Sequence, residues 1–195
     1  MQIKKFNLII KKKISSYNKV ISVDSDKSLS IRSFLIGSIC QNVSTANNIL
    51  ESADVKSTID ACRKLGVKIL KIKPQSYKIY GRGLGSFNIK KNSEIDFGNS
   101  GTLARLLIGV LSTNPNICIK IKGDHSLNKR SMIKIINLMS GFGATFFPKG
   151  KRNFPLKMIS SEMPIGINYK SGVSAQLKSA VMLAGLNSFG NTIIK

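Results

Sequence analysis

A short pattern recurs three times along this chain of 195 residues, each copy lying 73 residues after the one before. The copies span residues 28–36, 101–109 and 174–182. Each opens on a small residue, a cation follows four positions later, and apolar residues occupy positions typical of one helix face. Because four residues make about one helical turn, the pattern predicts three equivalent helices in a chain built from repeats.

The three cations of the pattern are Arg32, Arg105 and Lys178. A helix start presents unpaired N–H groups and the positive end of the helix dipole. Three such starts, each with its own cation, are suited to surround an anionic ligand. The sequence therefore predicts an anion site formed by equivalent positions of the three copies.

A second repeat lies between the copies, with amphipathic helices expected over residues 55–67 and 132–144. Each ends at a glycine, the residue typical of a helix C-terminus, and strands are expected directly after them, over 68–72 and 145–147. The repeating unit is therefore helix, strand, helix, strand, strand. It is complete from Lys27 and from Gly101, and a third unit begins at Ser174.

The third unit is expected to be incomplete, because the chain stops at Lys195 after one more strand, over 192–194. Repeats bury their apolar faces against neighbours, so we expect uncovered apolar surface there and interpret the chain as a fragment or one half of a larger protein. At the other end, strands are expected over 2–10 and 20–23, and Ser25 or Asp26 is expected to cap the first helix.

Thirty-one basic residues against nine acidic ones give a net charge of +22. Such a charge attracts nucleic acid, anionic membranes or small phosphorylated substrates. The sequence has no apolar run long enough to span a membrane and no signal peptide, so we expect a folded intracellular protein. Three cysteines, Cys40, Cys62 and Cys118, are expected to be buried free thiols, since their spacing is not that of metal ligands.

Three segments carry side chains suited to anions or polyols. Residues 26–32 place an ammonium and a hydroxyl at a helix start, with the guanidinium of Arg32 one turn on. Residues 98–102 form a glycine-bearing turn that enters a helix, where the backbone can approach an anion closely. Residues 172–176 offer hydroxyl and amide groups that can hydrogen-bond a polyol.

Other patterns favour structural roles. The glycines of residues 81–85 suggest a dinucleotide-binding loop, but no helix follows them, so we expect a turn between strands. Asp124 and His125, the only histidine, lack a nearby nucleophile pattern and are expected in a loop. The methionines and phenylalanines between residues 132 and 147 are expected in the core.

Four segments in this order, KSLSIR, GNSGTLAR, GDHSLNKR and SAQLKSA, closely resemble the enolpyruvylshikimate-phosphate (EPSP) synthase family. The resemblance implies transfer of the enolpyruvyl group of phosphoenolpyruvate to the 5-hydroxyl of shikimate 3-phosphate, in the shikimate pathway to chorismate and aromatic amino acids. It implies no metal and no organic cofactor. It implies a cytoplasmic enzyme that is monomeric at full length, and we expect neither nucleic acid nor membrane as a partner.

The resemblance also implies the fold, an α/β architecture of two domains, each with three βαβαββ units about a pseudo-threefold axis, an inside-out α/β barrel. Residues 1–22 would then be opening strands of the other domain. Residues 23–195 would be the substrate-binding domain, truncated in its third unit.

Site residues follow from the same resemblance. Lys27 matches a lysine that contacts both substrates and positions them for catalysis. The residues that match shikimate 3-phosphate contacts are Lys27, Ser28, Arg32, Ser174 and Gln176. The residues that match phosphoenolpyruvate contacts are Lys27, Gly101, Arg130 and Gln176. Possible further members of the site are Asn99, Thr102, Arg105 and Ala175, the last standing where many family members have a second serine.

Enolpyruvyl transfer needs a positioned acid and base. The resemblance places those carboxylates in the other domain, and none of the nine acidic residues here matches them. We therefore expect this chain alone to bind shikimate 3-phosphate weakly without turnover.

One alternative is a transferase acting on UDP-N-acetylglucosamine. That enzyme carries Lys-Asn where this chain has Lys27 and Ser28, and it has a reactive cysteine that no cysteine of this chain matches. The second alternative is a basic nucleic-acid-binding module. Against it, the basic residues of this chain are not interleaved with the aromatic residues that such modules use to stack bases.

Overall fold

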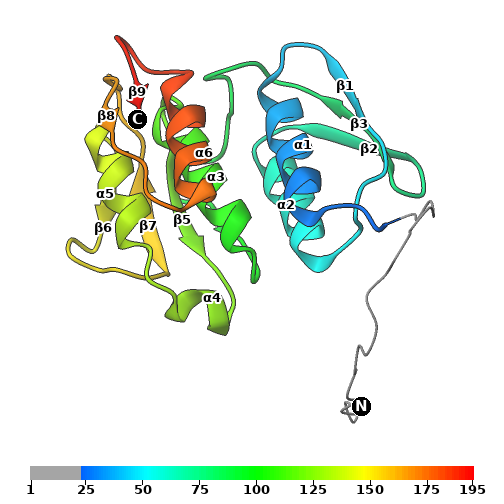
Figure 1. Cartoon of the computed structure of the whole chain (residues 1–195), viewed down its shortest axis with the longest axis horizontal. Helices are drawn as coiled ribbons and strands as arrows, with labels where there is room; N and C mark the ends of the chain where they lie inside the picture. Colours follow the sequence, from blue (N-terminus) through cyan, green and yellow to red (C-terminus); the bar gives the residue numbers. More distant parts are fainter. Residues whose placement is uncertain (1–22) are drawn as a thin grey trace, which may run out of the picture.

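The computed structural model describes residues 23–195, and Figure 1 shows them in sequence colours. The strand expected over 2–10, and the assignment of residues 1–22 to another domain, lie outside the described residues. So does most of the strand expected over 20–23, and Val23 itself is in no strand.

The first unit follows the predicted order of helix, strand, helix, strand, strand. Its elements are α1 (Lys27–Ile39), β1 (Val43–Ala46), α2 (Ala53–Lys64), β2 (Lys68–Lys73) and β3 (Ser76–Tyr80). The three strands form an antiparallel sheet in the order β1-β3-β2, and α1 and α2 pack against each other beside it (Figure 1). Gly66, at φ +85°, ends α2 as the sequence predicted.

The second unit repeats this order with two additions, the opening strand β4 (Glu94–Asp96) and the short helix α4 (His125–Lys129). Its elements in chain order are β4, α3 (Gly101–Ser112), β5 (Cys118–Lys122), α4, α5 (Ile133–Gly141), β6 (Thr145–Phe147) and β7 (Leu156–Ile159). The sheet order is β4-β5-β7-β6, with β4 and β5 parallel. The short helix α4 was not predicted. Asp124 caps it through Leu127 N (2.7 Å) and His125 is its first residue, so the expectation of a loop was wrong here.

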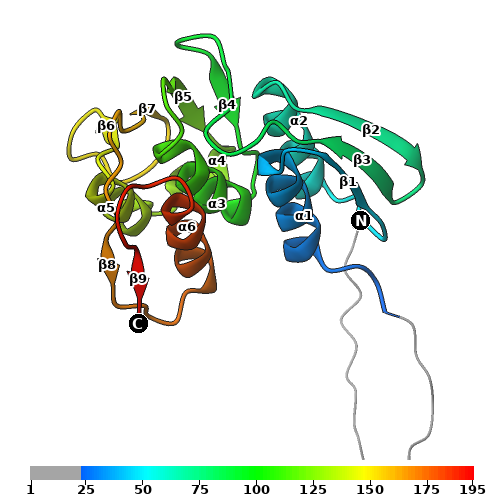
Figure 2. The same cartoon turned by 90° about the horizontal axis from the view of Figure 1, so that it is seen from above.

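The third unit contains β8 (Asn168–Tyr169), α6 (Ala175–Gly185) and β9 (Ile193–Ile194). β8 and β9 pair in parallel, as β4 and β5 do in the unit before. The fold is therefore a repeated βαβαββ arrangement, and over residues 23–195 its sheets do not close into a barrel (Figure 2). No helix in this part of the chain is long and apolar enough to cross a membrane.

The three repeat helices start with the same type of N-cap hydrogen bond. The spacing of these N-caps along the chain differs from the spacing of the sequence pattern. Their N-caps are Asp26, Ser100 and Ser174, each accepting from the backbone N–H three residues on. These caps recur every 74 residues rather than every 73. The pattern therefore opens at a different helix position in each copy: Ser28 is the second helical residue, Gly101 is the first, and Ser174 is the cap. The cations that follow them are not equivalent.

The core centres on α3, in which every residue except Arg105 is buried. Helices α5 and α6 pack against it on one side and α1 on another. Met132, Met139, Phe142 and Phe146 are buried as predicted, whereas Phe147 is 37% exposed. Among the cysteines only Cys62 is buried, and burial raises the pKa of its thiol to about 11; Cys40 and Cys118 are partly exposed, which corrects the prediction.

Glu51 joins β2 and β3 through one carboxylate. It accepts hydrogen bonds from Lys71 Nζ, Tyr77 Oη (2.7 Å) and Gln75 N (3.1 Å). The bonds from Lys71 and Tyr77 lower the pKa of Glu51 from 4.5 to about 2. Burial, followed by the bond to Glu51, raises the pKa of Tyr77 to about 12. The carboxylate is thus stabilised in the folded chain.

This hydrogen bonding makes stability depend on pH in a defined direction. Because the folded pKa is the lower one, the contribution of Glu51 is fully present above about pH 4.5 and is lost as pH falls toward 2. We expect Glu51→Gln to destabilise the chain at pH 7 and to do so less at pH 3, measured by urea unfolding. Glu162→Gln, at an exposed residue without a polar partner among residues 23–195, is the control and should show no such difference.

Candidate anion-binding site

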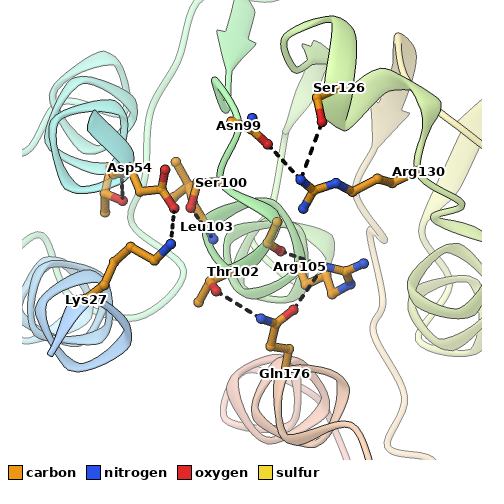
Figure 3. Close-up of polar contacts among 12 residues, drawn as sticks. Lys27, Asp54, Asn99, Ser100, Thr102, Leu103, Arg105, Ser126, Arg130 and Gln176 are labelled. Atoms are coloured by element: carbon orange, nitrogen blue, oxygen red, sulfur yellow. Dashed lines mark hydrogen bonds and ion pairs between the residues drawn. The ribbon is translucent and has the colours of Figure 1, made fainter. Parts of the chain in front are cut away.

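The starts of α3 and α6 are joined by a chain of polar side chains (Figure 3). Arg105 donates from Nη1 to the carbonyl oxygen of Gly101 (3.0 Å) and to Oε1 of Gln176 (2.9 Å). Gln176 in turn donates from Nε2 to Oγ1 of Thr102 (2.9 Å). Both ends of the Gln176 amide are therefore fixed, and the guanidinium of Arg105 is held one turn above the start of α3.

Arg130 reaches the same place from the end of α4, where it is the C-cap residue. Its Nη2 lies 2.8 Å from Oδ1 of Asn99, to which it donates, and 3.5 Å from Oγ of Ser126. Gly101 lies beside both guanidiniums: a Cβ there would be 2.8 Å from Nη1 of Arg105 and 3.5 Å from Nη1 of Arg130. The absence of a side chain at Gly101 thus lets both guanidiniums come close to the start of α3.

The electrostatics at this point favour an anion. Burial, and next the positive charge of Arg130, lower the pKa of Arg105 from its ordinary value. Within residues 23–195 neither guanidinium forms an ion pair with a carboxylate. Two cations held near each other without a counter-charge are stabilised by a bound anion. A cavity of about 290 Å³ adjoins Arg105 and is also lined by Ser131, Ser174 and Gln176.

The start of α1 supplies Lys27, Ser28 and Arg32. The ammonium of Lys27 lies 3.0 Å from Oδ2 of Asp54 at the start of α2. Arg32 donates to the carbonyl oxygen of Ser28 (3.2 Å) and to Oγ of Ser179 in α6 (3.3 Å). Ser28 itself is partly exposed. Arg32 and Arg105 therefore make the same contact with the carbonyl one turn before, and each also reaches α6.

The third copy contributes differently from the other two. Ser174 uses its hydroxyl as the helix cap, accepting from Leu177 N (3.4 Å), and Ala175 is exposed. Lys178 is exposed and makes no ion pair or side-chain hydrogen bond within the described part of the chain. The three cations are therefore not equivalent, which corrects that part of the prediction. Arg130, which the repeat did not indicate, lies beside Arg105 and Gly101 instead.

The arrangement provides binding groups and no acid–base pair. Lys27, Arg105 and Arg130 supply positive charge, and Asn99, Thr102 and Gln176 supply neutral polar groups near them (Figure 3). The carboxylate drawn in this view, Asp54, is paired with Lys27. Over residues 23–195 no cluster of histidine, cysteine and carboxylate side chains is suited to a metal ion. These groups are chemically suited to phosphate or carboxylate oxygens.

Sequence reasoning missed Asp54 and Ser126. Asp54 is one of several polar residues before an amphipathic helix, and nothing in its spacing indicates that it faces Lys27, 27 positions earlier. Ser126 lies in α4, which the repeat does not contain.

The repeated βαβαββ units, with cations at their helix starts, are the arrangement that the resemblance to an enolpyruvyl transferase fold implied. A sequence profile of EPSP synthase (3-phosphoshikimate 1-carboxyvinyltransferase) matches residues 11–195. The chain belongs to the EPSP synthase family.

Individual relatives agree with this assignment. The 3-phosphoshikimate 1-carboxyvinyltransferase of Paramagnetospirillum magneticum is 38% identical over 173 residues, which are 88% of this chain and 38% of the relative. That of Oceanobacillus iheyensis is 39% identical over 181 residues, 92% of this chain and 42% of the relative. A structure of EPSP synthase from Acinetobacter baumannii, at 34% identity, superposes with a TM-score of 0.82 over 90% of this chain and 39% of that one. The chain thus spans about two fifths of its relatives' length.

Proposed function

We propose that this chain is the substrate-binding part of an enzyme that transfers the enolpyruvyl group of phosphoenolpyruvate to the 5-hydroxyl of shikimate 3-phosphate, releasing phosphate. The observation that carries the proposal is the pair of guanidiniums of Arg105 and Arg130, held beside Gly101 with no carboxylate partner among residues 23–195. Membership of the EPSP synthase family supports the choice of substrates. The product leads to chorismate and the aromatic amino acids, in the cytoplasm of the cell.

Each site residue receives a role in this proposal. Lys27 contacts both substrates and positions them. The residues that hold shikimate 3-phosphate are Lys27, Ser28, Arg32, Ser174 and Gln176. The residues that hold phosphoenolpyruvate are Lys27, Gly101, Arg130 and Gln176. Asn99, Thr102 and Arg105 orient these groups, which their hydrogen bonds to Arg130 and Gln176 support. Ala175 offers no hydroxyl, so one contact is absent on that side.

In this proposal, residues 23–195 form a domain whose third unit is completed by a second helix that would pack between α6 and α1. In the second unit, α5 packs against α3 and against α6 of the next unit. The corresponding place beyond α6 is a groove of about 640 Å³, lined by apolar side chains that include Ile36 and Met182.

An environment-sensitive apolar dye should bind in this groove, because its apolar lining is open to solvent. The double change Ile36→Ser and Met182→Ser should remove most of the dye's fluorescence.

Binding of shikimate 3-phosphate tests the proposed function directly. In calorimetric titrations at physiological salt, we expect saturable binding that Lys27→Ala or Arg32→Ala weakens at least 30-fold, since hydrogen bonds to charged groups contribute about 1.5–3 kcal/mol each. Lys178→Ala removes the cation of the third copy, whose ammonium has no polar partner within residues 23–195, and should change the affinity less than twofold. Inorganic phosphate alone should not reproduce the binding.

Two results would contradict the proposal. Equal effects of Arg32→Ala and Lys178→Ala would mean that the chain attracts anions only through its net charge of +22. Tight binding of a random oligonucleotide with a steep salt dependence would favour a nucleic-acid-binding module instead.

Turnover is a separate expectation. Because the carboxylate of the site within residues 23–195, Asp54, is paired with Lys27, the isolated chain should release no phosphate from a mixture of both substrates. Phosphate release by the pure chain above the rate of a Lys27→Ala variant would show that its own residues supply the acid and base.

A further inference from the structure

The lysine of the site is held differently from its three arginines. Arg32 and Arg105 each donate to a carbonyl oxygen one helical turn earlier, and Arg130 donates to neutral side-chain oxygens. Lys27 instead pairs with a carboxylate, Oδ2 of Asp54, at 3.0 Å. Among the cations of the site it alone has a negatively charged partner within residues 23–195.

The two partners of this ion pair differ in freedom. The side chain of Asp54 is 20% exposed, whereas that of Lys27 is 50% exposed. Asp54 lies in the first turn of α2, where the helix dipole favours a negative charge, and its carbonyl oxygen accepts from Oγ1 of Thr58 (2.9 Å). Lys27 is the first residue of α1, where the dipole disfavours a cation. We therefore take the carboxylate of Asp54 as the group whose position is fixed and the ammonium of Lys27 as the group whose position can change.

A lysine needs such a partner more than an arginine does. Its ammonium is a point charge on a flexible stem and has no planar fork to set its direction. One of its three N–H donors is used by Asp54, which leaves two for a ligand. Figure 3 shows the Lys27 side chain extending from α1 toward Asp54 and the start of α3, where Ser100 and Leu103 are drawn.

We propose that Asp54 is a positioning residue, which holds the ammonium of Lys27 in the direction from which it binds the anionic substrate. This inference rests on the proposed function for the identity of the ligand. Asp54 touches no substrate atom in this proposal and acts through Lys27. The same carboxylate would, by its charge alone, weaken the binding of an anion, so charge and position predict opposite effects of removing it.

The experiment compares Asp54→Asn with Asp60→Asn by calorimetric titration with shikimate 3-phosphate. Both changes lie in α2 and remove one negative charge, but Asp60 is exposed and pairs with Arg63 (4.0 Å) rather than with a cation of the site. We expect Asp54→Asn to weaken binding at least fivefold and Asp60→Asn to change it less than twofold. In a Lys27→Ala background, Asp54→Asn should have no further effect beyond twofold.

A second measurement needs no ligand. Reductive methylation followed by mass spectrometry measures how readily each lysine amine reacts, and we expect Lys27 to react at least threefold faster in Asp54→Asn, with Lys178 unchanged. An unchanged rate at Lys27 would overturn the positioning role. So would tighter substrate binding by Asp54→Asn, or an equal loss with and without Lys27. Failure of the unaltered chain to bind shikimate 3-phosphate would count against the proposed function, while the reactivity of Lys27 would still decide the role of Asp54.

Discussion

Gly109→Ala is expected to destabilise the chain by about 2–3 kcal/mol, although alanine is the better helix former. Gly109 lies in α3 where α6 crosses it, and a Cβ there would be 2.6 Å from the carbonyl oxygen of Ala180 and 3.0 Å from its Cα. Both atoms are backbone, so no side-chain rotation relieves the contact and the helices must separate. Thermal unfolding should show a Tm lower by roughly 5–10 °C.

Gly141→Ala is the matched control, since Gly141 is also helical. A Cβ at Gly141, in α5, would lie 3.4 Å from Cγ2 of Ile167, an ordinary van der Waals distance. Helix propensity then dominates, and we expect a gain of up to about 1 kcal/mol. If both substitutions stabilise the chain alike, the close approach of α3 and α6 is not a constraint on the fold.

The crossing at Gly109 also sets the geometry of the site. Arg105 and Thr102 contact Gln176 across the same pair of helices, one to two turns before Gly109. A displacement of α6 therefore lengthens both contacts. Substrate affinity should fall together with stability in Gly109→Ala, a coupling that substitutions at exposed site residues should not show.

Repetition explains why much of this fold could be predicted from sequence. Burial against neighbouring units imposes the same apolar pattern on each repeat helix, so α1, α3 and α6 are visible as three copies of one pattern. The two helices that end at Gly66 and Gly143 are predictable for a local reason, since both glycines have positive φ.

The side-chain contacts of the site are less predictable because they depend on register and on inserted elements. A shift of one residue rotates a helical position by about 100°. Arg32 follows its helix cap by six residues, Arg105 by five and Lys178 by four. The three side chains therefore point in different directions: Arg32 and Arg105 contact α6, whereas Lys178 is exposed to solvent. Arg130 depends on α4, which has no counterpart in the first unit. The motif resemblance, rather than periodicity, indicated this residue.

Arg105→Gln is expected to remove most of the stabilisation that phosphoenolpyruvate gives to the chain. A ligand that binds only the folded state raises Tm in proportion to the logarithm of its concentration over Kd. Where phosphoenolpyruvate raises the Tm of the unaltered chain by about 8 °C, a hundredfold weaker affinity leaves about 2 °C or less. We expect such a loss because Arg105 supplies half of the positive charge beside Gly101 and orients Gln176.

The same substitution should leave the ligand-free chain nearly as stable, which separates binding from folding. Burial and the neighbouring charge of Arg130 both disfavour a guanidinium at this position, as the lowered pKa of Arg105 indicates. Glutamine removes that penalty and gives up the bonds to Gly101 and Gln176, so we expect a change within about 1 kcal/mol. Arg152→Gln, at an exposed arginine outside the site, removes the same charge and should keep the full ligand-induced shift. Equal losses of that shift in Arg105→Gln and Arg152→Gln would mean that net charge, rather than the geometry around Gly101, attracts the anion.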